Sequence, residues 1–176
     1  MSNQDTFSLR DLDLAAAWAE RPDEMKRLLS SFREAVRAYY QTRKRHKIQE
    51  PDDVEPLVLD MAALEAEVLR VILLDTRLQV IGVEDVAQGT NGRINFRMAD
   101  IFRTAVRKNA DAIILAHNHP SGDPTPSPND VHFTRQAIKA GSLLDIRVLD
   151  HFIVGGAKVL SLRRYKTLDW HIRFHD

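Results

Sequence analysis

The chain has no cysteine among its 176 residues. Disulfide bonds and thiolate metal ligands are therefore both excluded, and a bound metal would have to be held by histidine and carboxylate side chains. The chain also lacks an excess of either charge, since Lys+Arg and Asp+Glu number 25 each. Net charge therefore predicts no polyanionic partner, and any case for nucleic acid would rest on local patches.

Long apolar runs are absent as well. No stretch approaches the roughly 18–20 apolar residues that a membrane-spanning helix needs. The first residues, MSNQDTFSLRDLDL, have neither the basic start nor the apolar run of a signal peptide. We therefore expect a soluble, cytoplasmic protein with no membrane partner. Apolar residues make up 44% of the chain, which predicts a folded core.

The pattern divides the chain into a helical N-terminal extension with a linker (1–56), a domain (57–162) and a C-terminal tail (163–176). Helical spacing predicts a short helix at Asp11–Glu20 and a longer one after Pro22, while two prolines and four acids make Gln49–Pro56 a linker. We predict that the apolar stripe of the longer helix docks on the domain or pairs with a second chain. The stripe comprises Met25, Leu28, Leu29, Phe32, Val36, Tyr39 and Tyr40.

From residue 57 onward, strand-like and helix-like segments alternate, which predicts an α/β (α+β) fold with a mixed sheet flanked by helices. The predicted helices are 99–108 and 127–140. The predicted strands are 68–74, 78–86, 93–96, 112–116, 146–149, 152–154 and 158–160.

The stretch HNHPSGDPTPSPND, from His117 to Asp130, is the most informative part of the chain. His117 and His119 follow an apolar strand, so their side chains point to the same side and can bind one ion. Ser127 is a good N-cap for the next helix, which fixes the direction of Asp130 at its third position. Two histidines and one carboxylate leave a fourth position open, as in a catalytic zinc site.

This stretch resembles the JAMM signature, H-x-H-x7-S-x-x-D, of the MPN-domain zinc metalloproteases. Together with QGT (Gln88–Thr90) and RVLDHFIVGG (Arg147–Gly156), it closely resembles the RadC-like JAB domain. The resemblance covers about residues 57–162 and implies an MPN/JAB-like fold.

The resemblance also implies roles for individual residues. His117, His119 and Asp130 match the zinc ligands, and Ser127 matches the serine that stabilises the oxyanion. The signature requires an upstream general base, for which we choose Glu84, with Asp100 as its rival. Asp150 and Glu65 come next if neither acts.

We therefore predict a zinc-dependent metallopeptidase that cleaves a peptide or isopeptide bond in a peptide or protein substrate. The alternative is a DNA-repair or mobile-element accessory module that contacts nucleic acid and whose zinc site is vestigial. The basic stretch Arg43–Lys47 could serve that alternative. However, residues 1–50 contain no glycine, and so lack the helix-hairpin-helix that often precedes a RadC-like domain.

Overall fold

The computed structural model describes residues 21–42, 46–88, 97–165, 168 and 170. The predicted helix at Asp11–Glu20 and the predicted strand at 93–96 lie outside these residues. Among those described, no helix is long and apolar enough to cross a membrane.

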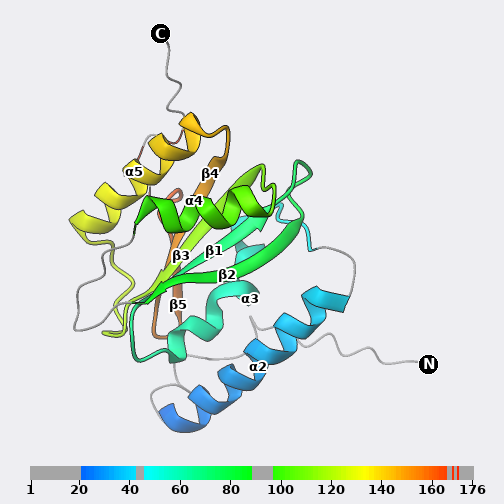
Figure 1. Cartoon of the computed structure of the whole chain (residues 1–176). Coiled ribbons are helices and arrows are strands. Elements are labelled where there is room, and N and C mark those ends of the chain that lie inside the picture. The colour runs from blue at the N-terminus through cyan, green and yellow to red at the C-terminus, as the bar shows by residue number, and fades with distance from the viewer. Residues whose placement is uncertain (1–20, 43–45, 89–96, 166–167, 169, 171–176) are drawn as a thin grey trace.

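A five-stranded mixed sheet forms the centre of the domain, with the strand order β2-β1-β3-β4-β5 (Figure 1). β1 pairs antiparallel with both β2 and β3, β3 pairs parallel with β4, and β4 pairs antiparallel with β5. The α/β fold class predicted from the sequence is therefore confirmed. The strands are β1 (Val68–Leu74), β2 (Val80–Gln88), β3 (Ala112–Asn118), β4 (Arg147–Gly155) and β5 (Lys158–Ser161).

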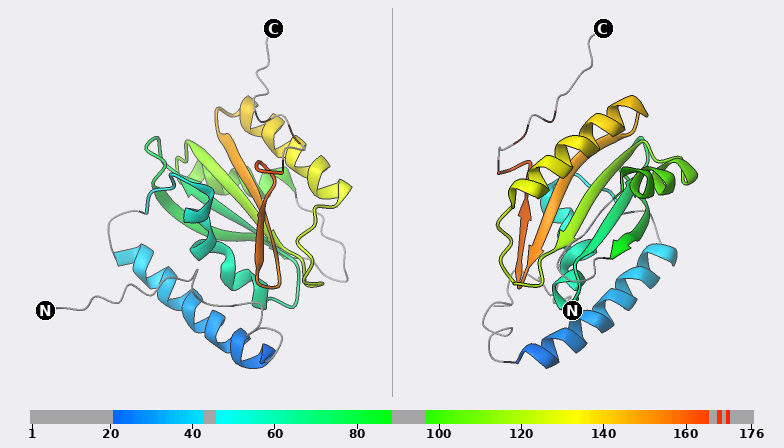
Figure 2. Two further views of the ribbon diagram at one scale, coloured as in Figure 1. Left: turned by 180° about the vertical axis from the view of Figure 1, so that it is seen from behind. Right: turned by 60° about the vertical axis from the view of Figure 1, so that its left-hand side comes forward.

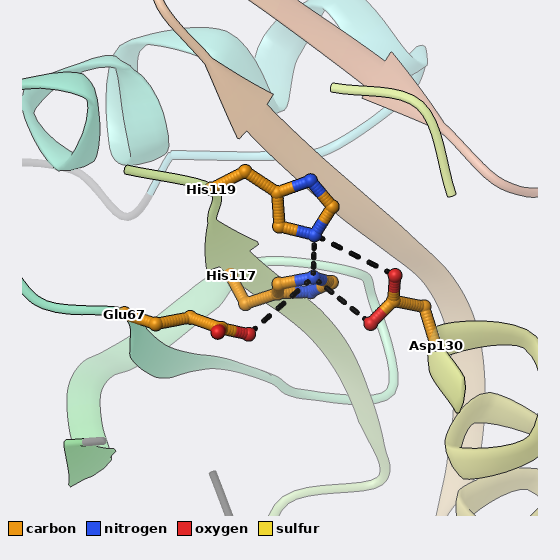
Figure 3. Close-up of side chains that lie close together, drawn as sticks. All are labelled: Glu67, His117, His119 and Asp130. Carbon is orange, nitrogen blue, oxygen red and sulfur yellow. Dashed lines mark hydrogen bonds and ion pairs between the residues drawn. The ribbon is translucent and has the colours of Figure 1, made fainter. Parts of the chain in front are cut away.

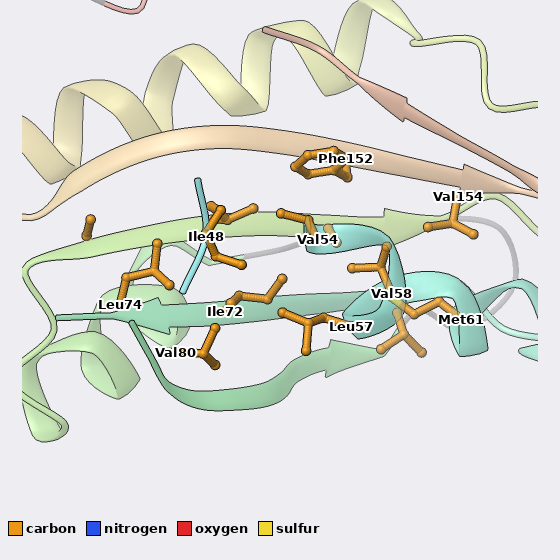
Figure 4. Packing of buried hydrophobic residues seen from close by; sticks show 14 residues of the cluster. Ile48, Val54, Leu57, Val58, Met61, Ile72, Leu74, Val80, Phe152 and Val154 are labelled. Carbon is orange, nitrogen blue, oxygen red and sulfur yellow. The ribbon is translucent and has the colours of Figure 1, made fainter. Parts of the chain in front are cut away.

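Helices cover both faces of the sheet. α4 (Met98–Arg107) and α5 (Pro128–Leu143) pack on one face, where α5 is the crossover between the parallel strands β3 and β4. The other face is covered by the chain between Ile48 and Met61. Side chains alternate between the two faces along β1. Leu69, Val71 and Leu73 therefore lie in the core under α4 and α5. Ile72 and Leu74 lie in the core under the segment from Ile48 to Met61 (Figure 4).

The segment Gln49–Pro56, predicted to be a linker, is folded. It forms η2 (Pro51–Val54), continues into α3 (Glu55–Val58), and η3 (Leu59–Ala63) follows. Its prolines lie at helix starts, where no backbone N–H is needed, and its acid Asp53 accepts hydrogen bonds from the N–H groups of Gln49 and Glu50. Val54 is fully buried, so the segment belongs to the core.

The N-terminal helix α2 (Pro22–Thr42) lies against η3, on the outside of this layer (Figure 2). Leu29 of the predicted stripe is buried against Leu59, whereas Leu28 is exposed. Arg33 also reaches Asp60 at 3.3 Å and Asp85 at 3.0 Å. Both carboxylates bind the buried guanidinium of Arg70 in β1, so a charge network links α2 to the sheet.

Candidate metal centre

Four side chains that can bind a metal converge at one end of the central strands (Figure 3). His117 lies in β3, His119 just beyond it, Asp130 in the first turn of α5, and Glu67 immediately before β1. The backbone N–H of His119 donates to the carbonyl of Val154 at 2.7 Å, which continues the pairing with β4 past the end of β3. The strand geometry therefore extends to His119, and both imidazoles face the same side, as predicted.

The spacing of the polar atoms fits a small divalent cation. His117 Nε2 is 3.0 Å from His119 Nε2 and 3.2 Å from Asp130 Oδ1, and His119 Nε2 is 3.5 Å from Asp130 Oδ2. Tetrahedral zinc with bonds of about 2.0–2.1 Å holds its ligand atoms about 3.3–3.4 Å apart. Glu67 Oε1 lies further out, 4.0 Å from His117 Nε2.

His119 is oriented by the loop that follows it. Its Nδ1 is 2.8 Å from the carbonyl oxygen of Asp123. A carbonyl only accepts, so Nδ1 carries the proton and donates it. In the neutral ring, Nε2 then presents its lone pair to the other members of the group.

His117 is oriented by a buried chain of hydrogen bonds. The Thr134 hydroxyl donates its one proton to the carbonyl of Asp130, at 2.6 Å, so its 2.6 Å contact with Nδ1 of His151 requires a proton on that nitrogen. Burial lowers the pKa of His151, which is therefore neutral and has a bare Nε2. This Nε2 accepts from Nδ1 of His117 at 2.7 Å, which leaves a lone pair on His117 Nε2.

Two imidazole lone pairs and a carboxylate thus face one another across about 3 Å. Such an arrangement is repulsive unless a positive charge lies between the groups, either a proton or a metal ion. The set of two nitrogens and one oxygen, without thiolate, is one that catalytic zinc sites use. The residues present therefore fit zinc.

The pKa values of the two carboxyl groups in this cluster are shifted in opposite directions. Burial acts to raise the pKa of Asp130, but its contacts with the imidazoles of His117 and His119 and the hydrogen bond from Ser127 outweigh it and hold that pKa well below its usual range. Burial raises the pKa of Glu67, and its attraction to the two histidines only partly offsets this. Asp130 is therefore suited to bind a cation, and Glu67 to accept and return a proton.

Ser127 caps α5 and holds Asp130. Its side chain accepts from the backbone N–H of Asp130 at 3.2 Å and donates to Asp130 Oδ2 at 2.7 Å. Asp130 Oδ2 also accepts from the backbone N–H of Ser127 at 2.7 Å, which completes a reciprocal capping box. The predicted N-cap is confirmed, and the single hydroxyl proton is engaged by Asp130.

The structure does not bring Glu84 to this group. Glu84 lies in β2 opposite Val71, and its carboxylate is 3.8 Å from Lys108 Nζ. Asp100 pairs with Arg103 within α4 at 3.1 Å. Glu65 is exposed beside Lys26, and Asp150 accepts hydrogen bonds from Ser161 and the backbone around it.

Glu67 is the acid that lies beside the two histidines. The pairing of β1 with β3 aligns Leu69 with His117, so the residue two positions before Leu69 lies beside the end of β3. The sequence signal is an acid directly before the first buried strand. It becomes specific only when β1 and β3 are known to be antiparallel neighbours.

The mixed sheet, its covering helices and the two-histidine, one-aspartate group define an α/β domain of the MPN/JAB type. Residues 48–167 match the RadC-like JAB domain family, and the chain belongs to that family. A UPF0758 protein of Chloroflexus aurantiacus is 48% identical over 121 residues, which are 68% of this chain and 53% of that protein.

Two further relatives show the same extent of similarity. A UPF0758 protein of Moorella thermoacetica is 43% identical over 128 residues, covering 72% of this chain and 56% of that protein. One from Alkaliphilus oremlandii is 38% identical over 124 residues, covering 70% and 53%. The chain thus spans about half the length of the curated relatives it matches.

Proposed function

We propose that this protein is a zinc-dependent hydrolase that cleaves a peptide or isopeptide bond in a peptide or protein substrate. The observation that carries the proposal is the convergence of two imidazole lone pairs and an ionised carboxylate beside a second carboxylate of raised pKa. Membership in the JAB domain family supports it. The names of the relatives specify no activity.

In this proposal His117, His119 and Asp130 hold the metal. Zinc, when bound, supplies the Lewis acidity that makes water a nucleophile near neutral pH and polarises a substrate carbonyl. His117 is 1% exposed, whereas the side chains of His119 and Asp130 are 17% and 14% exposed, so the group opens to solvent on one side. A substrate carbonyl can approach from that side.

Glu67 is the general base in place of Glu84. Its carboxylate lies 4.0 Å from His117 Nε2, beyond the spacing of a ligand shell, so Glu67 is placed to hydrogen-bond the attacking water rather than to hold the metal. Glu67 takes a proton from the attacking water and returns it to the amine nitrogen as the C–N bond breaks. Its raised pKa favours both transfers near neutral pH.

Ser127 is proposed to contribute a hydrogen bond to the oxygen of the tetrahedral intermediate. Its proton rests on Asp130 in this structure, so the hydroxyl must turn away from Oδ2 to act on the substrate. The backbone N–H of Ser127 continues to hold Oδ2 during that turn.

A cleavage assay with two matched glutamate variants tests the proposal. Zinc-loaded protein is incubated with a peptide and isopeptide library, and products are identified by mass spectrometry. Glu67→Gln should keep its zinc and lose roughly 10²–10⁴ in turnover, because an amide cannot accept the proton. Glu84→Gln, the same chemical change outside the group, should cleave like the wild type.

Two results would contradict the proposal. Loss of turnover in Glu84→Gln but not in Glu67→Gln would return the base to Glu84. A zinc-loaded wild type that cleaves nothing in the library would refute the hydrolase and favour the nucleic-acid-associated alternative. That alternative would be recognised by DNA binding that weakens steeply with salt.

A further inference from the structure

Asn118, the residue between the two histidines, uses its whole side-chain amide on the segment that precedes β1. Its Oδ1 accepts from the backbone N–H of Val68 at 2.8 Å. Its Nδ2 donates to the carbonyls of Ala66 at 3.1 Å and Leu64 at 3.3 Å. Asn118 is 1% exposed, so solvent cannot replace these bonds if they are lost.

These bonds bracket Glu67. The Ala66 carbonyl belongs to the peptide group before the Cα of Glu67, and the Val68 N–H belongs to the peptide group after it. Fixing both peptide planes fixes φ and ψ of Glu67, and hence the direction of its Cα–Cβ bond. Among the residues that the structure describes, Glu67 alone is bonded by Asn118 on both sides in this way.

The regular ladders of the sheet begin after Glu67. The pairing of β1 with β3 begins at Leu69 and His117, and its pairing with β2 begins at Val68 and Gln88. The side chain of Asn118 points to the opposite side of β3 from His117 and His119. It therefore reaches the incoming chain from one side, while the two histidines meet the Glu67 carboxylate from the other.

We propose that Asn118 is a positioning residue that holds the Glu67 carboxylate beside His117 through the two peptide groups adjoining Glu67. The same strand end thus sets the metal ligands and, through Asn118, the base. A displacement of a reacting group by about 1 Å can lower a rate roughly 10²-fold. The inference rests on the proposed function for its effect on turnover, although not for its effect on geometry.

The test uses two substitutions of similar size to asparagine. Asn118→Leu removes the acceptor and both donors. Asn118→Asp keeps an acceptor for Val68 but turns a carboxylate oxygen toward two carbonyls, and it serves if the leucine variant does not fold. Ile72→Val is the matched control, because it removes a buried methylene group from β1 and leaves the hydrogen bonds of Asn118 in place.

The first readout needs neither metal nor substrate. Hydrogen exchange of the Val68 amide should accelerate at least tenfold in Asn118→Leu, which has no acceptor for it, and not in Ile72→Val. Crystal structures of the variants should show the Glu67 carboxylate displaced from His117. An unshifted Glu67 together with an unchanged Val68 amide would overturn the inference, whether or not the protein is a hydrolase.

The second readout is a double-mutant cycle on turnover. Asn118→Leu should still bind zinc, because Asn118 contacts none of the three proposed ligands through its side chain, and should lose roughly 10–100-fold in kcat. In the Glu67→Gln background the same change should cost almost nothing, because the base it positions is already inactive. Equal losses in both backgrounds would show a merely structural role and contradict the proposal.

Discussion

Nε2 of His151 lies 2.7 Å from Nδ1 of His117, in the interior of the domain. Hydrogen bonds run from the Asp130 carbonyl through Thr134 and His151 to His117, with one proton in each contact. The proton that Thr134 donates therefore determines which nitrogen of the proposed ligand His117 keeps its lone pair. His151 is thus bonded directly to the proposed ligand His117.

His151→Leu should therefore weaken zinc binding by roughly 10–100-fold, since His117 loses the partner that fixes its tautomer and ring orientation. His151→Gln can still accept from His117 and should recover part of the affinity. Competition with a chelator measures both. Affinities within about twofold of the wild type in both variants would remove His151 from the account of the site.

Ser127→Ala should lower both stability and turnover while zinc remains bound. Loss of the cap costs about 1 kcal/mol, and loss of an oxyanion donor costs roughly 10²–10³ in rate. Ser127→Thr keeps a hydroxyl and is the control. Thermal melting and kcat are measured on both variants, and a lower melting temperature with unchanged kcat would leave Ser127 as a helix cap alone.

Gly155→Ala should destabilise the loop that orients His119. A Cβ at Gly155 would lie 2.5 Å from the nitrogen of Pro124 and 2.7 Å from the carbonyl carbon of Asp123, both backbone atoms that cannot rotate away. Because the Asp123 carbonyl accepts from His119, the clash should weaken zinc binding and cost about 1–3 kcal/mol of stability.

Gly82→Ala is the matched control for that substitution. Its Cβ would meet only the side chain of Leu73, at 3.1 Å, and a side chain can adjust. Melting curves and zinc titrations compare the two variants. Equal effects on zinc affinity would show that the close approach at Gly155 does not support the site.

Zinc affinity should rise with pH through a window above the ordinary histidine value of 6.5. The hydrogen bond to Asp130 raises the pKa of His119, and burial does not cancel that effect. A protonated His119 cannot bind zinc, so protons compete with the metal to a higher pH than at an ordinary histidine.

In the metal-free protein, the pairing of protonated His119 with Asp130 stabilises the fold, so stability should fall with rising pH while zinc affinity rises. Its contribution to folding is complete below pH 6.5 and is lost as the pH rises through the raised pKa of His119. Zinc titrations at a series of pH values, alongside unfolding of the metal-free protein, check both signs. A zinc affinity that stays constant across the window would contradict the assignment.

The parts of the site that lie close together in sequence could be predicted from it. Alternation along a strand places His117 and His119 on one side, and the capping box fixes Asp130 without knowledge of the fold. Glu67 could not be found in this way, because its place depends on which strand pairs with β3 and in which direction. Locally, Glu67 and Glu84 are both acids in or beside an apolar strand.

Two elements of the fold departed from their predictions for physical reasons. Prolines and acids made Gln49–Pro56 look like a linker, yet the prolines start helical turns and Asp53 accepts backbone N–H groups. Asp150 and His151 suggested a break between two short strands. Both are buried and hydrogen-bonded, so β4 continues through them as one strand from Arg147 to Gly155.

One zinc ion is expected to bind between His117, His119 and Asp130. Anomalous diffraction from zinc-loaded crystals, measured above and below the zinc absorption edge, locates the ion without reference to activity. We predict a single peak about 2.0–2.2 Å from Nε2 of both histidines and from a carboxylate oxygen of Asp130. A fully occupied peak elsewhere on the chain, with these three side chains unliganded, would contradict the account.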